Sequence, residues 1–171
     1  MNKIITNIGE ITILRAAEDD LSDVLRLWLE AAEWLEVKGI LQWRPNSFTQ
    51  ESVLEHYQKT ELYIAKLNET IVGSFSIQWS DEFIWEELNN NSSGYIHRLV
   101  VARNFKGMNL GIELLTWAER YIQSTGKKAS RLDCMADNQH LNTFYRKAGY
   151  NYIKRINRKY WSASLFEKVY S

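Results

Sequence analysis

The chain has 171 residues, one cysteine, and 21 basic and 21 acidic side chains, so its formal net charge is zero. This length is typical of one domain with a single core, so we expect residues 1–171 to form one domain. The neutral balance argues against a nucleic-acid-binding protein, and the single cysteine excludes an internal disulfide and fits a reducing compartment. We find no signal peptide or membrane span, and we expect a cytoplasmic protein with no membrane partner.

The N-terminal part predicts one strand followed by two helices. Residues 10–15 have the alternating pattern of a short strand. Apolar residues at helical spacing follow it, and Gly39 is the expected end of that first helix. Ser47, with Gln50 three residues later, has the form of a capping box, so a second helix is expected over residues 48–59.

A hairpin and a long loop are expected next. Residues 62–67 and 70–79 form two predicted strands that are joined by the turn Asn68-Glu69. The acidic and asparagine-rich residues 80–93 predict a loop, with one helical turn near residues 83–88. A lid and an idle insertion are both compatible with this pattern.

The central stretch predicts a buried strand over residues 95–101, then a turn, then an amphipathic helix from Leu110. At such a turn the first N–H groups of the helix lack intrahelical partners, and the helix dipole adds partial positive charge. The turn, Lys106-Gly107-Met108-Asn109-Leu110-Gly111, therefore suits a phosphate or a pyrophosphate.

The last third predicts a strand over residues 130–135, a helix over 138–148 and two final strands over 150–158 and 165–170. The economical arrangement is an α/β fold with one mixed, mostly antiparallel sheet of about six to seven strands and helices on both faces. We interpret the basic residues of this region as a solvated face: Lys127, Lys128, Arg131, Lys147, Lys154, Arg155, Arg158 and Lys159.

Two stretches resemble the GNAT superfamily of N-acetyltransferases. The first, LVVARNFKGMNLGIELL from Leu99, is similar to the acyl-CoA-binding motif of that family, Gln/Arg-x-x-Gly-x-Gly/Ala after a strand. Lys106 stands at the Gln/Arg position, Asn109 at the first glycine and Gly111 at the second. Lysine keeps the positive charge, and asparagine is the non-glycine residue that best tolerates a positive φ.

The second stretch, RLDCMADNQHLNTFYRKAGY over residues 131–150, resembles the later motif of the same family, with Asn138 and Tyr145 on its expected positions. The resemblance implies an acyl-CoA N-acyltransferase fold and direct acetyl transfer from acetyl-CoA to a primary amine of a small molecule or peptide, in a ternary complex. The altered Lys106 and Asn109 support an alternative, a non-catalytic acyl-CoA-binding module. A third hypothesis is a nucleic-acid-associated protein, and the zero net charge disfavours it.

The resemblance also implies which residues bind the cofactor. Main-chain N–H groups near residues 99–101 would bind the pantetheine and the acetyl oxygen, and the amides of the turn would bind the pyrophosphate. The expected cofactor-binding residues are Leu99, Val100, Val101, Lys106, Gly107, Met108, Asn109, Leu110, Gly111, Ile112, Asn138 and Tyr145.

Three side chains are candidates for proton transfer or for a hydrogen bond to the cofactor. From the resemblance, Tyr145 is the expected general acid to the CoA thiolate, against the alternative of a core or rim tyrosine. Asn138 has two compatible interpretations, a helix N-cap and a cofactor hydrogen bond. His97 lies just before residues 99–101, whose N–H groups would bind the acetyl oxygen. Histidine is suited to removing a proton from an ammonium group, so His97 is a candidate general base, and a purely structural role is the alternative.

Other bases stay open: Glu33, Glu36, Asp133, the acids of residues 80–90, or a water chain. Cys134 is interpreted as a small buried residue and not as an acyl carrier. No metal is expected, since the histidines lack any ligand spacing with other residues.

The acceptor pocket is the least determined feature. The resemblance makes Trp34, Trp43 and Arg44, with the region over residues 79–87, the candidates to line it. An exposed tryptophan cluster would indicate a cage for a cationic amine, whereas Arg44 would recognise a carboxylate, and the sequence does not choose. The oligomeric state is left open, a homodimer included.

Overall fold

The structure, a computed structural model, describes residues 2–40 and 43–171. Its strands form one sheet in the order β1-β2-β3-β4-β5-β6-β8-β7. The strands are β1 (Lys3–Thr6), β2 (Gly9–Arg15), β3 (Glu61–Leu67), β4 (Thr70–Gln78), β5 (Ser93–Val101), β6 (Ala129–Met135), β7 (Asn151–Asn157) and β8 (Ser162–Val169). The helices are α1 (Leu21–Val37), α2 (Gln50–Lys59), α3 (Glu82–Trp85), α4 (Leu110–Ser124) and α5 (Gln139–Lys147).

The predicted fold class is confirmed, with one strand more than expected. The sheet is mixed and mostly antiparallel, with β5 and β6 running parallel, and helices cover both faces. The additional strand is β1, which pairs antiparallel with β2 from Lys3 opposite Thr12 to Thr6 opposite Gly9. It is short and half exposed, so its residues give little of the alternation that marks a strand in a sequence.

The chain divides into two compact units, which are described separately. One unit contains Met1–Ser76 and Arg98–Trp117, and the other contains Ile77–His97 and Ala118–Ser171. The chain passes from one to the other inside β4, β5 and α4. The expectation of one domain over residues 1–171 stays a prediction.

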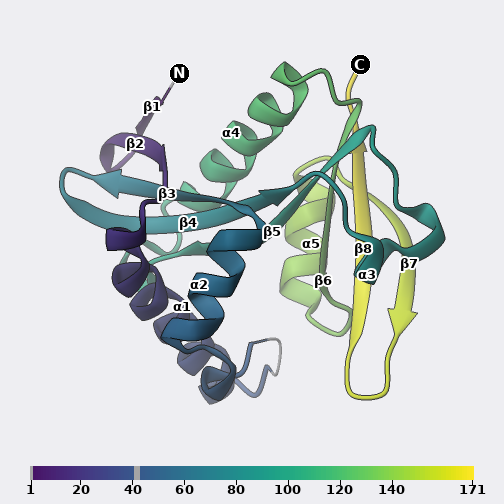
Figure 1. Cartoon of the computed structure of the whole chain (residues 1–171), viewed down its shortest axis with the longest axis horizontal. Coiled ribbons are helices and arrows are strands. Elements are labelled where there is room, and N and C mark those ends of the chain that lie inside the picture. Colours follow the sequence, from purple (N-terminus) through teal and green to yellow (C-terminus); the bar gives the residue numbers. More distant parts are fainter. Residues whose placement is uncertain (1, 41–42) are drawn as a thin grey trace. The chain divides into compact units, whose positions relative to one another are not determined.

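In the first unit, α1 and α2 lie side by side and share a buried apolar cluster (Figure 1). Trp28 of α1 is its largest buried side chain, and its indole N–H donates to the Ser74 hydroxyl at 3.0 Å. Its ring also contacts Phe48 and His56 edge-on or tilted, with centroid separations of 5.5 and 5.3 Å. A buried indole with a satisfied N–H fixes α1 against the strand that carries Ser74.

The second unit contains β6, β8 and β7 with α5 alongside (Figure 1). Its apolar cluster is centred on Trp85 and Tyr95, whose rings meet at 5.8 Å. Arg131 lies in this cluster: it is 8% exposed, its guanidinium stacks on Trp85 at 4.3 Å, and its Nε donates to Glu167 at 2.6 Å. The interpretation of Arg131 as part of a solvated face is therefore wrong, because an aromatic ring and a carboxylate compensate its burial.

The structure also corrects the predicted start of α2, which begins at Gln50 and not at residue 48. The predicted capping pair was Ser47 with Gln50, but the N-cap is Thr49, whose hydroxyl accepts the Ser52 N–H at 3.1 Å. Ser47 instead ends a short 3₁₀ turn that begins at Pro45. Pro45 suits the first position of that turn, and the extended residues after it place the α-helical start two residues later than predicted.

The hairpin and the long loop follow the prediction. Asn68 adopts a positive φ of 54° in the turn between β3 and β4. The loop after β4 contains one α-helical turn, α3, followed by a 3₁₀ turn over Glu86–Leu88. Trp85 is 1% exposed, so the loop is fastened to the unit by a buried indole. Among the residues that the structure describes, no helix is both long and apolar enough to cross a membrane.

Candidate functional site

The turn between β5 and α4 has the backbone that the sequence predicts. Gly107 and Asn109 have φ values of 80° and 62°, both in the left-handed region. Asparagine is one of the few non-glycine residues that occupies this region readily. A Cβ on Gly107 would meet nothing within 4 Å, and residues 106–109 are exposed. Helix α4 begins at Leu110, so its first amide N–H groups lie next to an open turn, which is the arrangement that binds an anion.

Basic side chains beside this turn are stacked on Trp34 of α1. The Arg103 guanidinium lies 3.5 Å from the indole centroid, and the Lys106 ammonium lies 4.4 Å from it. The Glu30 carboxylate accepts the backbone N–H of Arg103 at 3.0 Å. Burial lowers the pKa of Arg103 and Glu30 opposes this change, but a guanidinium stays cationic throughout. Trp34, which was expected to line the acceptor pocket, therefore holds two cations at the predicted phosphate turn.

The strand that precedes the turn contains one residue with an unusual backbone, Arg98. Its φ of 54° is rare for a residue with a long side chain and is a local irregularity within β5. Its guanidinium lies over the rings of Phe48, Trp28 and Trp43, at 4.9, 5.4 and 5.6 Å.

The two candidate acceptor tryptophans thus already contact cations of the chain itself. Trp43 contacts Arg98, and Trp34 contacts Arg103 and Lys106. Arg44, the third candidate, is exposed beside Trp43. This arrangement gives no support to a cage for a cationic amine and leaves Arg44 accessible to an acidic group.

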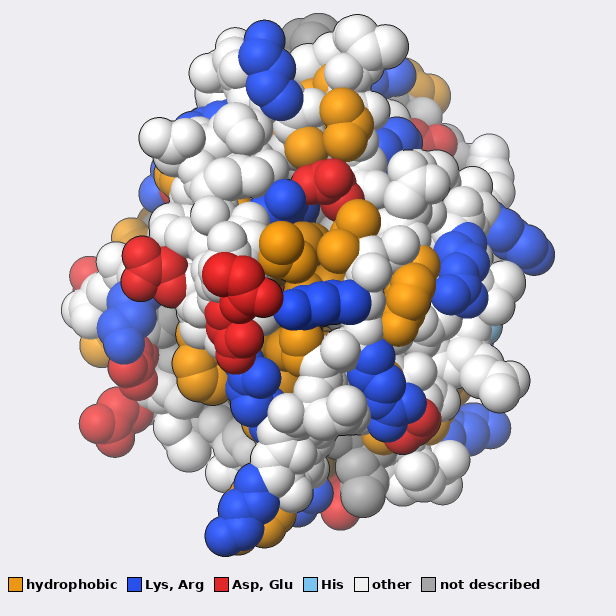
Figure 2. Space-filling view, turned by 90° about the vertical axis from the view of Figure 1, so that its right-hand side faces the viewer, with side chains coloured by type: hydrophobic (Ala, Val, Ile, Leu, Met, Phe, Trp, Pro, Cys, Tyr) orange, Lys and Arg blue, Asp and Glu red, His pale blue; other side chains and the backbone are white. Residues whose placement is uncertain are grey.

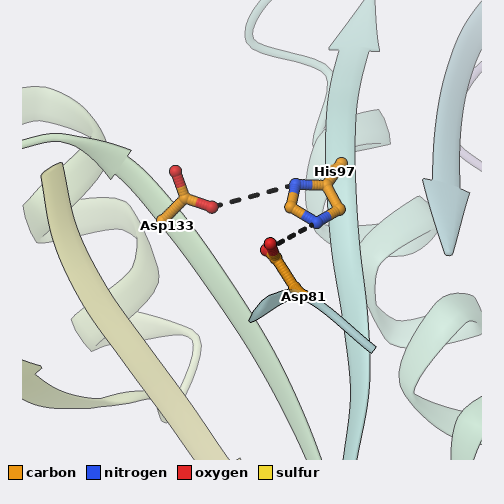
Figure 3. A group of neighbouring side chains, drawn as sticks. All are labelled: Asp81, His97 and Asp133. Carbon is orange, nitrogen blue, oxygen red and sulfur yellow. Dashed lines mark ion pairs between the residues drawn. The ribbon is translucent and has the colours of Figure 1, made fainter. Parts of the chain in front are cut away.

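In the second unit, His97 lies between two carboxylates (Figure 3). Its Nε2 is 3.1 Å from Asp81 Oδ2, and its Nδ1 is 3.8 Å from Asp133 Oδ1. His97 and Asp133 lie on adjacent parallel strands, because Tyr95 of β5 pairs with Arg131 of β6 two residues earlier on each strand. Asp81 comes from the loop after β4. The side chains are 20%, 20% and 7% exposed for His97, Asp133 and Asp81.

These three side chains could bind a divalent cation, since each offers a donor atom within 4.8 Å of the others. The ring, however, presents a different nitrogen to each carboxylate, whereas a cation needs its ligands to converge on one point (Figure 3). We therefore keep the prediction that the protein uses no metal.

We expect zinc to give no saturable heat in calorimetry at neutral pH and EDTA to leave activity unchanged. Loss of activity with EDTA, restored by zinc, would contradict this prediction.

In the second unit, Asn138 lies directly before α5 and Tyr145 lies within it. Asn138 is the N-cap of the helix, and its side-chain oxygen accepts the Leu141 N–H at 3.1 Å. The N-cap interpretation is therefore confirmed, while the cofactor hydrogen bond stays a prediction. The Tyr145 ring is buried and contacts Phe144 and Phe166 at 5.2 and 5.9 Å.

The hydroxyl of Tyr145 is kept protonated. Burial raises its pKa, and the neighbouring Cys134 and Asp133 raise it further. The hydroxyl is protonated at neutral pH, as a general acid must be, and the raised pKa makes it release that proton less readily than an ordinary tyrosine. Cys134 is 4% exposed, and burial with the nearby Asp133 raises its pKa to about 12. A thiol with this pKa is not a nucleophile at neutral pH, so the structure agrees with a packing role for Cys134.

These raised pKa values predict alkaline instability. The folded protein keeps the Cys134 proton, which the unfolded chain loses above pH 9, so this contribution is present below pH 9 and is lost as the pH rises to about 12. The change from 9.0 to about 12 corresponds to a loss on the order of 4 kcal/mol. Tyr170, whose pKa burial raises to about 12, acts in the same direction above pH 10.

Urea unfolding between pH 8 and pH 11 measures this loss. We expect the unfolding free energy to be nearly constant up to about pH 8.5 and then to fall. The Cys134→Ala variant should start less stable and lose less between pH 9 and pH 10. Equal slopes for the two proteins would show that Cys134 does not contribute.

The basic residues of the C-terminal third do not form a field of one sign. Lys154, Arg155 and Arg158 make ion pairs with Glu87, Asp137 and Glu86, at 3.2, 3.1 and 2.6 Å. Figure 2 shows the face around α3 and β7, where basic side chains lie among hydrophobic ones and next to acidic ones. Such mixed charge supports the expectation that nucleic acid is not a partner.

The structure distributes the predicted site residues between the two units. Residues 99–112, with Trp34, Trp43 and Arg44, lie in the first unit, and His97, Asn138 and Tyr145 lie in the second. Sequence reasoning included Asp81 only among the acids of residues 80–90 and did not place it beside His97. It also missed the stacking of Arg103 and Lys106 on Trp34. Sequence spacing gives no signal for either, since both depend on segments far apart in the chain.

Comparisons with known proteins agree on one family. The profile of the acetyltransferase (GNAT) family matches residues 22–150. The chain is 32% identical over 160 residues to an uncharacterized N-acetyltransferase, YesJ, of Bacillus subtilis, a match that covers 90% of this chain and 87% of that protein.

Solved structures show the same fold. A GNAT-family acetyltransferase from Listeria monocytogenes is 25% identical, with a TM-score of 0.79 and coverage of 99% of this chain and 100% of that one. The PaiA N-acetyltransferase from Thermoplasma acidophilum, solved in complex with coenzyme A, is 19% identical, with a TM-score of 0.73 and coverage of 94% and 99%.

Proposed function

The chain belongs to the acetyltransferase (GNAT) family, and from this premise we propose that it transfers the acetyl group of acetyl-CoA directly to a primary amine within a ternary complex. The acceptor is a small molecule or a peptide. The observation that carries the proposal is the open turn before α4, with its left-handed Gly107 and Asn109 and the cations held on Trp34. Bare amides, a helix N-terminus and fixed positive charge together suit a diphosphate.

The residues of the first unit would bind and orient acetyl-CoA. The amides of residues 107–112 would hold the pyrophosphate, with Lys106 and Arg103 adding positive charge beside it. Main-chain N–H groups of residues 99–101, which follow the positive-φ residue Arg98, would bind the pantetheine and the acetyl oxygen. Acetyl-CoA supplies an activated thioester, and the protein supplies position and hydrogen bonds.

Residues of the second unit would move the protons. His97 would take a proton from the ammonium form of the acceptor, so that a neutral amine attacks the carbonyl carbon. Tyr145, which is protonated at neutral pH, would give its proton to the sulfur as the carbon–sulfur bond breaks. Asn138 would add a hydrogen bond to the cofactor while it caps α5.

Thiol release from acetyl-CoA across a panel of amines tests the proposal. The panel should pair amines with and without a carboxylate, such as a diamine with an α-amino acid, and should include peptides with a free N-terminus. We expect thiol release that depends on one class of amine, with an N-acetylated product seen by mass spectrometry. Binding of CoA without turnover of any amine would contradict the proposal and favour an acyl-CoA-binding module.

A further inference from the structure

Asp81 is fixed in place by its own loop. Its backbone N–H donates to Asn89 Oδ1 at 2.9 Å, and its Oδ1 accepts the Ile84 N–H at 3.2 Å as the N-cap of α3. Asn89 in turn donates to the Ser80 hydroxyl at 2.9 Å, which closes the loop on itself. The carboxylate therefore has little freedom to turn away from His97.

The other oxygen of this carboxylate is buried and directed at the imidazole (Figure 3). Asp81 Oδ2 has no hydrogen-bond partner among residues 2–40 and 43–171, although it lies 3.1 Å from His97 Nε2. A buried carboxylate oxygen without a hydrogen bond costs free energy, and proteins rarely retain one without a function. A positive charge on the imidazole would turn this contact into a charge-assisted pair.

We propose that Asp81 is a positioning residue that holds His97 in orientation and compensates the charge that the ring gains when it accepts a proton from the acceptor amine. This inference rests on the proposed function. In this step one N–H bond of the ammonium group breaks and one N–H bond to the imidazole forms. The product is a neutral amine and an imidazolium between two carboxylates.

Asp81 is the stronger of the two carboxylates for this role. It lies closer to the ring than Asp133, at 3.1 against 3.8 Å, and its side chain is less exposed, at 7% against 20%. Charge compensation is larger at shorter distance and in a drier environment. Asp133 adds a second negative charge at the other ring nitrogen.

The Asp81→Asn variant isolates the charge. Asparagine is as good an N-cap as aspartate, so the hydrogen bond to Ile84 and the loop should be retained. We expect kcat to fall about 10- to 100-fold, while the KM for acetyl-CoA changes less than about twofold. Asp23→Asn is the matched control, because Asp23 is an exposed carboxylate of α1 that pairs with Arg26. Its kcat should equal that of the unmodified protein.

A double-mutant cycle with His97→Gln separates positioning from structure. If Asp81 acts through His97, the double variant should be no slower than His97→Gln alone. A further fall of about tenfold on adding Asp81→Asn to His97→Gln would overturn the inference, and so would an unchanged kcat in Asp81→Asn. Should Asp81→Asn fail to fold by circular dichroism, Asp81→Ser takes its place in the cycle, because serine also caps a helix and carries no charge. Unmodified protein that turns over no amine would instead contradict the proposed function.

Discussion

The Gly111→Val variant should lose affinity for coenzyme A by at least about 100-fold while it remains folded. Gly111 is the second residue of α4, next to the amides that would hold the pyrophosphate. A β-branched side chain there would keep the phosphates from at least two charge-assisted hydrogen bonds, each of which contributes about 1.5 to 3 kcal/mol. Valine is no worse a helix former than glycine, so the helix itself should not be weakened.

Calorimetric titration with coenzyme A measures this loss. Gln123→Val is a matched control, since it adds the same side chain at an exposed position near the other end of α4. The control should bind like the unmodified protein, and Gly111→Ala should fall between the two. Unchanged affinity in a folded Gly111→Val variant would remove the turn from the cofactor site.

The Tyr145→Phe variant should turn over acetyl-CoA about 100-fold more slowly, with cofactor affinity nearly unchanged. The change removes one hydroxyl and leaves the ring packed against Phe144 and Phe166. If Tyr145 protonates the departing sulfur, the loss should appear in kcat and not in the dissociation constant for coenzyme A.

Steady-state kinetics with the best amine of the panel would measure both quantities. Tyr160→Phe provides the control, because Tyr160 is 79% exposed and removal of its hydroxyl should change neither quantity. Equal turnover in Tyr145→Phe and the unmodified protein would exclude Tyr145 as the acid and leave it as a member of the aromatic cluster.

Features that depend on local sequence were predictable. The turn before α4, the N-cap at Asn138 and the hairpin at Asn68 are each specified by neighbouring residues. Asn109 shows the physical reason, since asparagine is the residue that replaces glycine most readily at a positive φ. The overall fold followed from these elements together with the family resemblance.

Features that depend on distant contacts were not predictable. Asp81 and His97 are 16 residues apart and meet because Asn89 closes the loop and Trp85 anchors it. Arg131 looked like a surface residue until its partner, Glu167, was placed beside it by the pairing of β6 with β8. In each case the sequence shows the residue type but not the register that selects its partner.

Trp34 shows the same limit at the candidate site. The family resemblance favoured an acceptor-lining role, and the structure adds that its ring contacts Arg103 and Lys106 beside the turn that precedes α4. Arg103 stacks on Trp34 from a segment about 70 residues later in the chain, and a contact over that distance produces no periodic pattern in the sequence.

Calorimetric titration of the unmodified protein with coenzyme A tests the central claim most directly, since the whole account depends on a diphosphate-bearing thiol at the turn before α4. We expect saturable, one-to-one binding that acetyl-CoA displaces and that weakens as salt is added. No binding of either molecule by correctly folded protein would contradict it.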